Sequence, residues 1–249
     1  MSNSTICEPG NFRFIHGGLF SLGVAALPGY ELHRVRFRRQ LPLAEGFHAI
    51  AAHLRQQGRP LAALASCELR SPAALTREDF GKFNQQYVDL QASLGFSGQP
   101  PYPIGRSNLA PLYHPPAKPT LFAFSYTAAA RQGRPPAPVD FVISGKPENV
   151  EGSPGSVFAG TDVSAEGLRQ KAAYVMQVLR QRVDILGAEW PSVNGAQIYT
   201  VHPIEAVIQS AFADSGLTDV GLTLFPSHPP VIGLEFEVDV RAVSRELIL

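Results

Sequence analysis

Three stretches of the chain carry apolar residues at steps of three and four, the spacing that predicts amphipathic helices. Each stretch stops at a glycine, the residue that most often follows the C-terminus of a helix. Thr76 lies three residues before Asp79 and gives the middle stretch a start that resembles a capping box. The three series are Leu43, Phe47, Ile50 and Leu54 before Gly58; Phe80, Phe83, Tyr87, Leu90 and Leu94 before Gly95; and Leu168, Ala172, Met176, Leu179, Val183 and Leu186 before Gly187. A shorter fourth helix is predicted from Pro203 to Phe212.

Shorter apolar runs between these helices predict β-strands. The run at 231–240 alternates most strictly, with Leu234, Phe236, Val238 and Val240 on one face and Glu235, Glu237, Asp239 and Arg241 on the other. We expect the first face in a core and the second in water or at a site. The other strands are predicted at 11–16, 29–39, 61–69, 120–127, 139–144, 156–161, 196–201 and 220–224.

The order of these elements repeats once along the chain. The segment 128–138 carries two arginines, a glycine and three prolines, a composition that is typical of a linker. On either side of it the elements read β-β-α-β-α-β-β, with a period of about one ordinary domain. We therefore predict two tandem domains that arose by duplication, at residues 1–135 and 136–249.

Composition and charge limit the classes of partner that the protein can bind. The 249 residues include 21 Lys and Arg against 21 Asp and Glu, so the formal charge is zero and no basic field exists to hold nucleic acid. With 45% hydrophobic residues the chain can bury a substantial core. The N-terminus does not resemble a signal peptide, and no run approaches eighteen apolar residues. We expect a cytoplasmic protein that contacts neither nucleic acid nor membrane.

Residues that could carry a metal or cofactor are sparse. Cys7 and Cys67 lie far apart in the sequence and are expected to be free thiols. His48 and His53 are five residues apart and point to different faces of a helix, so they lack the spacing of metal ligands. No nucleophile elbow, phosphate-binding loop or dinucleotide fingerprint is present. We expect no metal and no cofactor.

Arg106 is the best candidate for a ligand-binding residue. It follows a proline-rich turn and comes soon after the helix that contains residues 79–94. A guanidinium held in a fixed position binds carboxylates bidentately, which suggests small anionic metabolites as ligands. The alternative is an arginine in a loop with its charge in solvent. The same choice holds for Asn84 and Glu235, which could be polar positions on wet faces of a helix and a strand.

The first half resembles the reactive-intermediate deaminase superfamily, also called RidA or YjgF. The resemblance rests on Asp79-Phe80-x-x-Phe83-Asn84-x-x-Tyr87, on Arg106-Ser107 after a proline-containing turn, and on the strand that follows. In the second half it rests on Ser144-Gly145, on the segment 221–226 and on the closing strand 233–239 with its Glu-x-Glu pair. The resemblance implies an α+β fold, with two tandem chorismate-mutase-like domains that each pair a mixed sheet with two helices on one face. It also implies assembly as a homo-oligomer, with a trimer favoured.

The resemblance assigns roles to five residues. Arg106 would hold a substrate carboxylate, Asn84 would lie near the same cleft, and Glu235 would position the water that hydrolyses an imine. Ser107 and Ser144 would line the cleft. Neither half carries a complete set, since Leu217 or Thr218 stands in place of the second arginine and residues 121–124 replace the first glutamate. Either Arg106 and Glu235 meet between the halves, or the site has been lost or rebuilt.

The resemblance implies a cofactor-free hydrolytic deaminase of an enamine or imine carboxylate. A double-length chain with a diverged site favours a dedicated catabolic step, such as deamination of 2-aminomuconate in the degradation of aromatic amines or nitroaromatics. Lys118, Arg131 or Arg134 could then bind a second carboxylate. Two alternatives stay open: a non-catalytic protein that binds a metabolite, and an enzyme that processes chorismate on the same fold.

Overall fold

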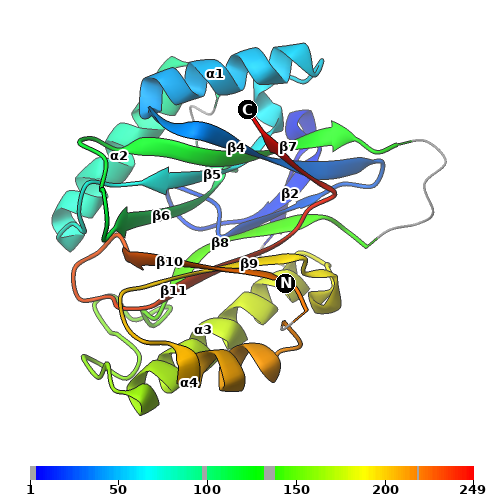
Figure 1. The fold of residues 1–249 in the computed structure, drawn as a ribbon. Coiled ribbons are helices and arrows are strands. Elements are labelled where there is room, and N and C mark those ends of the chain that lie inside the picture. The colour runs from blue at the N-terminus through cyan, green and yellow to red at the C-terminus, as the bar shows by residue number, and fades with distance from the viewer. Residues whose placement is uncertain (1–3, 97–99, 132–137, 218) are drawn as a thin grey trace.

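The computed structural model describes residues 4–96, 100–131, 138–217 and 219–249. Their strands form one twelve-stranded sheet that folds over itself, with helices on two opposite outer sides and strands between them (Figure 1). Short 3-10 turns occur at Glu8–Gly10, Leu61–Ala63 and Trp190–Ser192. Among the described residues, no helix is long and apolar enough to cross a membrane.

The first half builds one part of the sheet in the order β4-β7-β5-β6. Strands β5 and β6 are parallel, whereas β7 runs antiparallel to both of its neighbours, β4 and β5. Helices α1 and α2 lie on the outer side of these strands (Figure 1). The bounds are β4 Tyr30–Pro42, α1 Leu43–Gln56, β5 Leu64–Arg70, α2 Arg77–Ser93, β6 Gly105–Pro111 and β7 Thr120–Ala129.

The second half repeats this arrangement. Its strands follow the order β8-β11-β9-β10, with β9 and β10 parallel and β11 antiparallel to β8 and β9. Helix α3 and the short α4, which continues as one π-helical segment, cover its outer side (Figure 1). The bounds are β8 Phe141–Pro147, α3 Ala165–Ile185, β9 Gly195–Thr200, α4 Glu205–Val207, the π segment Ile208–Ala213, β10 Gly221–His228 and β11 Glu237–Ala242. The predicted α+β class is confirmed, and both halves share the order β-α-β-α-β-β.

Strands at the two ends of the chain cross between the halves. The N-terminal strands β1 (Ser4–Cys7), β2 (Phe12–Ile15) and β3 (Gly23–Ala26) extend the sheet of the second half, because β3 pairs with β8. The C-terminal strand β12 (Arg245–Ile248) pairs in parallel with β4 of the first half. The predicted boundary after residue 135 lies outside the described residues, and the division into 1–135 and 136–249 stays a prediction.

The helices form where the apolar periodicity predicts them. Thr76 caps α2, since its Oγ1 accepts a hydrogen bond from the backbone N of Asp79 over 3.1 Å. Ser164 caps α3 in the same way through Gly167, over 3.2 Å. The apolar face of each helix packs on its own sheet, so the molecule has a separate core under α1 and α2 and another under α3 and the π segment.

The inner faces of the two halves meet through buried polar side chains. Arg34 of β4 forms a two-pronged ion pair with Glu68 of β5, at 2.6 and 2.9 Å. Gln197 of β9 donates to Glu68 over 3.2 Å and to Asp239 of β11 over 3.0 Å, which joins the halves. Glu237 and Asp239 are buried here. Of the two alternatives expected for this face, water or a site, solvation does not hold for these two residues, because the opposite sheet covers them.

Other differences from the predicted elements have local causes. Residues 156–161 form turns, with glycines at positive φ at positions 155 and 160, and contribute one isolated bridge instead of a strand. The strand predicted at 231–240 begins only at Glu237. Arg106 belongs to β6 and not to a loop, because Cys67 of β5 pairs with it. The strands β1, β3 and β12 are too short to give a clear alternation.

Candidate functional site

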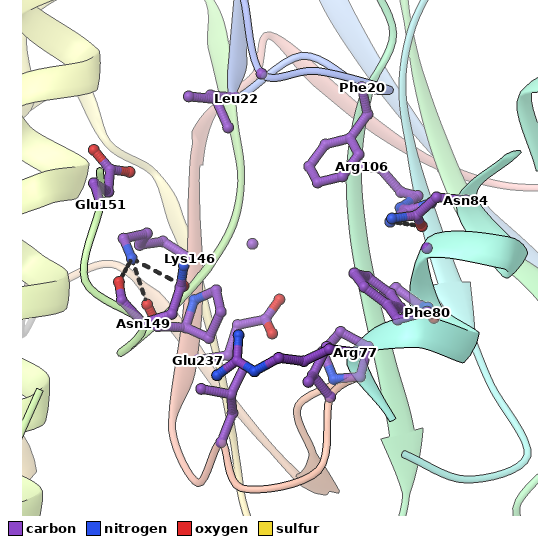
Figure 2. A pocket seen from close by; sticks show the side chains of 18 of the residues that line it. Phe20, Leu22, Arg77, Phe80, Asn84, Arg106, Lys146, Asn149, Glu151 and Glu237 are labelled. Atoms are coloured by element: carbon purple, nitrogen blue, oxygen red, sulfur yellow. Dashed lines mark hydrogen bonds between the residues drawn. The ribbon is translucent and has the colours of Figure 1, made fainter. Parts of the chain in front are cut away.

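A cavity of about 490 Å³ lies where the two halves meet. Its volume falls in the range of small-molecule sites. Helix α2 and strand β6 line it from the first half, and strands β8 and β11 with helix α3 line it from the second. In Figure 2, Arg106, Asn84 and Phe80 stand on one side, with Lys146, Asn149 and Glu151 across from them. The site is therefore built from both copies of the repeat.

Arg106 is buried in the wall of this cavity and is only partly hydrogen-bonded. Its Nη2 donates to Oδ1 of Asn84 over 2.7 Å, while Nε and Nη1 have no partner among the described residues. The guanidinium carbon lies 4.4 Å from the ring centroid of Phe20 and 5.4 Å from that of Phe80. Burial lowers the pKa of Arg106 to about 10, which leaves it charged at neutral pH. A buried cation with free N–H groups is suited to an anionic ligand.

Glu237 supplies a carboxyl group to the same cavity. It is 2% exposed, and its Oε2 has no hydrogen-bond partner in the described part of the chain. Gly145 of β8 faces it so closely that a methyl group there would overlap Oε1. Burial raises the pKa of Glu237 well above its ordinary value, and the nearby charges of Asp239 and Glu148 raise it further. Such a carboxyl group keeps its proton to a higher pH than an exposed glutamic acid does, so it can act as a proton donor and then, once ionised, as an acceptor.

The far wall carries two more cations. The Nζ of Lys146 donates to the carbonyl of Asn149 over 2.5 Å and to that of Pro147 over 2.7 Å. Burial and the neighbouring Arg182 lower the pKa of Lys146 to about 8. Arg182 of α3 is 5% exposed and pairs with Glu151 through Nη2 at 2.5 Å. A fourth cation, the exposed Arg77, lies at the rim and donates to the carbonyl of Gly155 over 3.3 Å.

The structure brings together two of the five predicted site residues at the cavity wall, Asn84 and Arg106. Ser107 and Ser144 lie beside it and hold strands together instead. The Oγ of Ser144 accepts from the backbone N of Arg106 over 2.9 Å and donates to the carbonyl of Ser21 over 2.7 Å. The Oγ of Ser107 donates to Asp239 over 2.7 Å and accepts from the N of Gly145 over 3.0 Å.

Glu235 is not brought to the cavity. Its carboxylate lies 2.8 Å from Nε2 of His202, and Glu237 takes the place beside the cavity that was expected for Glu235. The two residues lie on the same face in the alternating pattern, so the sequence alone does not distinguish which of them reaches the cavity. The register of the sheet determines that Glu237 lies at the cavity, because β11 begins at Glu237, opposite Pro147 of β8 and Tyr199 of β9.

The cations of the second half were missed by sequence reasoning. Lys118 and Arg131 do not line the cavity, and Arg134 lies outside the described residues. Arg182 and Lys146 are there instead. Arg182 directly precedes Val183 of the apolar stripe on α3, and this position at the stripe's edge is the one signal that could have found it. Within the described residues, no three His, Cys, Asp or Glu side chains gather as a metal site would need.

A family model and one relative, both described as deaminases, match this chain over nearly its whole length. Residues 5–247 match the model of a family described as 2-aminomuconate deaminase CnbZ. The chain is 38% identical over 255 residues to the 2-amino-5-chloromuconate deaminase of Comamonas testosteroni, and the match covers all of both chains.

The solved structures that match this chain are much more distant in sequence. A chorismatase structure matches 93% of this chain and 81% of its own, with a TM-score of 0.52 and 13% identity. The YjgF gene product of E. coli matches 47% of this chain and 88% of its own, with a TM-score of 0.33 and 15% identity. The chorismatase match concerns the fold alone.

Proposed function

Because the chain belongs to the 2-aminomuconate deaminase CnbZ family, we propose that it removes the amino group of 2-aminomuconate or a substituted 2-aminomuconate in the cavity between its halves. The reaction is a hydrolysis that releases ammonia, and it requires no cofactor. One observation carries this proposal: the buried side chains of Arg106 and Glu237, from different halves of the chain, line the same cavity. The first can hold a carboxylate and the second can transfer protons next to it.

The chemistry needs one proton donor that later acts as an acceptor. In its protonated form Glu237 gives its proton to a carbon of the enamine, and the C–N bond becomes an iminium group. The resulting carboxylate takes a proton from water as the water oxygen bonds to the carbon that carries nitrogen. The proton of the new hydroxyl group then passes to nitrogen, and the C–N bond breaks. Ammonia departs, and the carbon that carried it becomes the carbonyl carbon of a ketone. Acid–base help of this kind is worth about 10²- to 10⁴-fold in rate.

Arg106 acts by binding and orientation. A carboxylate on its free N–H groups places the neighbouring enamine carbon inside the cavity, so one interaction both binds and positions the substrate. Asn84 fixes the plane of the guanidinium through the hydrogen bond to Nη2. The rings of Phe20 and Phe80 exclude water from the ion pair, which strengthens it.

The test compares two glutamates on the same segment. We expect Glu237→Gln to reduce ammonia release from freshly generated 2-aminomuconate by at least about 10²-fold, because the amide can neither give nor take the proton. The matched Glu235→Gln, whose carboxylate faces His202, should stay within a few-fold of the native protein. If Glu237→Gln keeps full activity, or if Glu235→Gln alone loses it, the proposed mechanism is wrong.

The two alternative functions give other results in the same assay. A protein that only binds metabolites would bind a dicarboxylate with no ammonia release. A chorismate-processing enzyme would release pyruvate from chorismate and leave 2-aminomuconate intact. Either result, obtained with correctly folded protein, would replace the deaminase proposal.

Self-association is part of the proposal. Leu112, Tyr113 and Leu224 are among the large apolar residues that are exposed, by 43%, 69% and 46%. The backbone N of Leu112 donates a hydrogen bond to the carbonyl of Pro226 in β10, the strand that carries Leu224. Neighbouring apolar side chains of this size often mark contacts between chains. We assign a homotrimer, which light scattering would detect as three times the mass of 26.9 kDa. A single peak at the monomer mass would contradict it.

The pathway and location follow from the proposed substrate. We assign the reaction to the degradation of aromatic amines or nitroaromatics in the cytoplasm. A strain that lacks the protein should accumulate 2-aminomuconate, or compounds formed from it without the enzyme, when it grows on an aminophenol. Normal growth of this strain without accumulation would show that the protein has no role in this pathway.

A further inference from the structure

Arg182 is a buried cation whose hydrogen bonds are only partly satisfied. It lies on α3 with 5% exposure, and among the described residues its Nε and Nη1 have no partner. Glu151, which accepts from Nη2, is about half exposed at its side chain and so covers one edge of the guanidinium. Leaving charged N–H groups buried without partners costs free energy, and a bound anion would remove that cost.

The two buried arginines of the cavity come from opposite walls. Arg106 belongs to the wall of β6 and α2, whereas Arg182 belongs to the wall of α3, with its ion-pair partner Glu151 across the cavity from Arg106 in Figure 2. Lys146 stands on the same wall as Arg182, but its Nζ already donates to the backbone oxygens of Pro147 and Asn149 and to the Asn149 side chain. Arg182 is therefore the group on that wall with N–H donors to offer.

The charge of the cavity favours a dianion over a monoanion. Four cationic side chains line it against the carboxyl groups of Glu151 and Glu237, so the described lining residues carry an excess of two positive charges even with both acids ionised. A monocarboxylate on Arg106 leaves one of these charges without a counterion. A ligand with a carboxylate at each end neutralises both and spans the cavity.

We propose that Arg182 binds the second carboxylate of the substrate, so that Arg106 and Arg182 together select a dicarboxylate by the distance between its two ends. This inference rests on the proposed function for the identity of the substrate and adds the residue that recognises its far end. Arg182 is a specificity-determining residue in this account, and Glu151 holds its guanidinium in the binding orientation.

Two unreactive ligands with the same carbon chain isolate the second carboxylate. In trans,trans-muconate both ends are carboxylates, whereas in sorbate one carboxylate is replaced by a methyl group. We expect calorimetry to show that the native protein binds muconate at least about 10-fold more tightly than sorbate, the difference that one charge-assisted hydrogen-bonded pair produces. Equal affinities would overturn the inference with no variant needed.

Variants then show which arginine is responsible for the preference for muconate over sorbate. Arg182→Gln should weaken muconate binding by about 10- to 100-fold and leave sorbate almost unchanged. Arg106→Gln should weaken both ligands. The matched control is Arg180→Gln, two residues earlier on the same helix, where the exposed guanidinium stacks on Trp190 and should not affect either ligand. If Arg182→Gln keeps the preference, or if Arg180→Gln loses it equally, Arg182 is not the second anchor.

Two further measurements protect the test from a folding defect. Glu151→Gln removes the competing charge but keeps an oxygen that can accept from Nη2 of Arg182, so it should keep or increase the preference for muconate. Arg182→Lys keeps the charge without the planar fork and should show a smaller loss than Arg182→Gln. Both experiments measure binding, so they stand apart from the assay of Glu237→Gln. Ammonia release without a muconate preference would overturn only the role of Arg182, and a preference without ammonia release would overturn only the deaminase.

Discussion

Arg106 and Asn84 form a hydrogen bond of 2.7 Å between Nη2 and Oδ1, at the wall of a cavity that both halves of the chain enclose. Asn84 presents a neutral acceptor to this cation. An amide oxygen fixes the guanidinium plane while leaving its full positive charge for a ligand, which a carboxylate at the same place would neutralise. The identity of residue 84 therefore decides how strongly Arg106 attracts an anion.

Asn84→Asp should convert the anchor into an internal ion pair. We expect the Kd for muconate to rise by about 10- to 100-fold, since the new carboxylate competes with that of the ligand. Calorimetry on the variant measures this change. The control is Gln86→Glu, which adds the same charge on the exposed side of α2 and should leave the affinity within a few-fold. Unchanged affinity in Asn84→Asp would mean that Arg106 does not contact the ligand.

Gly145 makes room for Glu237, so its replacement tests where that carboxyl group must be. Gly145→Ala should push Glu237 out of position and reduce ammonia release by about 10²-fold or more, at a cost in stability of about 1–3 kcal/mol for overpacking. Gly221→Ala in β10 is the matched control, because a methyl group there makes only ordinary contact with the carbonyl of Asn194. Rates and thermal unfolding of both variants provide the measurement. Equal activities would show that the position of Glu237 does not matter.

The affinity for a dianion should depend on pH through Lys146. Burial and the charge of Arg182 lower its pKa to about 8 from the ordinary 10.5, so the ammonium loses its proton as the pH rises through about 8. We expect muconate binding to weaken as the pH rises through about 8, because the cavity loses the positive charge of Lys146. Lys146→Met should bind more weakly throughout and lack this step. A native protein whose affinity is flat from pH 7 to 9.5 would contradict the assignment.

The elements were predictable from sequence where the pattern is local. The periodicities around Phe47, Phe83 and Leu179 give α1, α2 and α3 within a few residues, because each helix buries one stripe on its own sheet. Asn84 and Arg106 were predictable as a pair because a motif of a known superfamily holds both. These features need only one half of the chain.

The rest depends on how the halves meet, which no single stretch encodes. Glu237 lies on a polar strand face that becomes buried only because the opposite sheet covers it. Arg182 belongs to a helix whose charged positions resemble those of any surface helix until the loop that carries Glu151 packs beside it. The exchange of β3 and β12 between the halves comes from short strands that have little alternation of their own. Contacts between distant segments decide all of these.

The ion pair between Arg34 and Glu68 gives a prediction about stability. Burial opposes ionisation of Glu68, but the charge and hydrogen bonds of Arg34 outweigh it and lower the pKa of Glu68 to about 2. Glu68→Gln removes the carboxylate that binds Arg34 with two hydrogen bonds and leaves it the more distant carboxylate of Glu246, at 3.6 Å, so it should reduce the free energy of unfolding by up to about 3–5 kcal/mol at pH 7. Denaturant unfolding monitored by circular dichroism measures the loss.

The same pair fixes the sign of the pH dependence. The folded pKa of Glu68 lies below the ordinary value of 4.5, so its contribution to stability is complete above pH 4.5 and is lost as the pH falls toward about 2. The gap between the native protein and Glu68→Gln should therefore be largest at neutral pH and narrow at pH 3. Glu78→Gln, which breaks the exposed pair with Lys82, should leave the free energy of unfolding nearly unchanged at both. A gap that stays constant from pH 7 to pH 3 would show that Glu68 does not stabilise the junction of the halves through its charge.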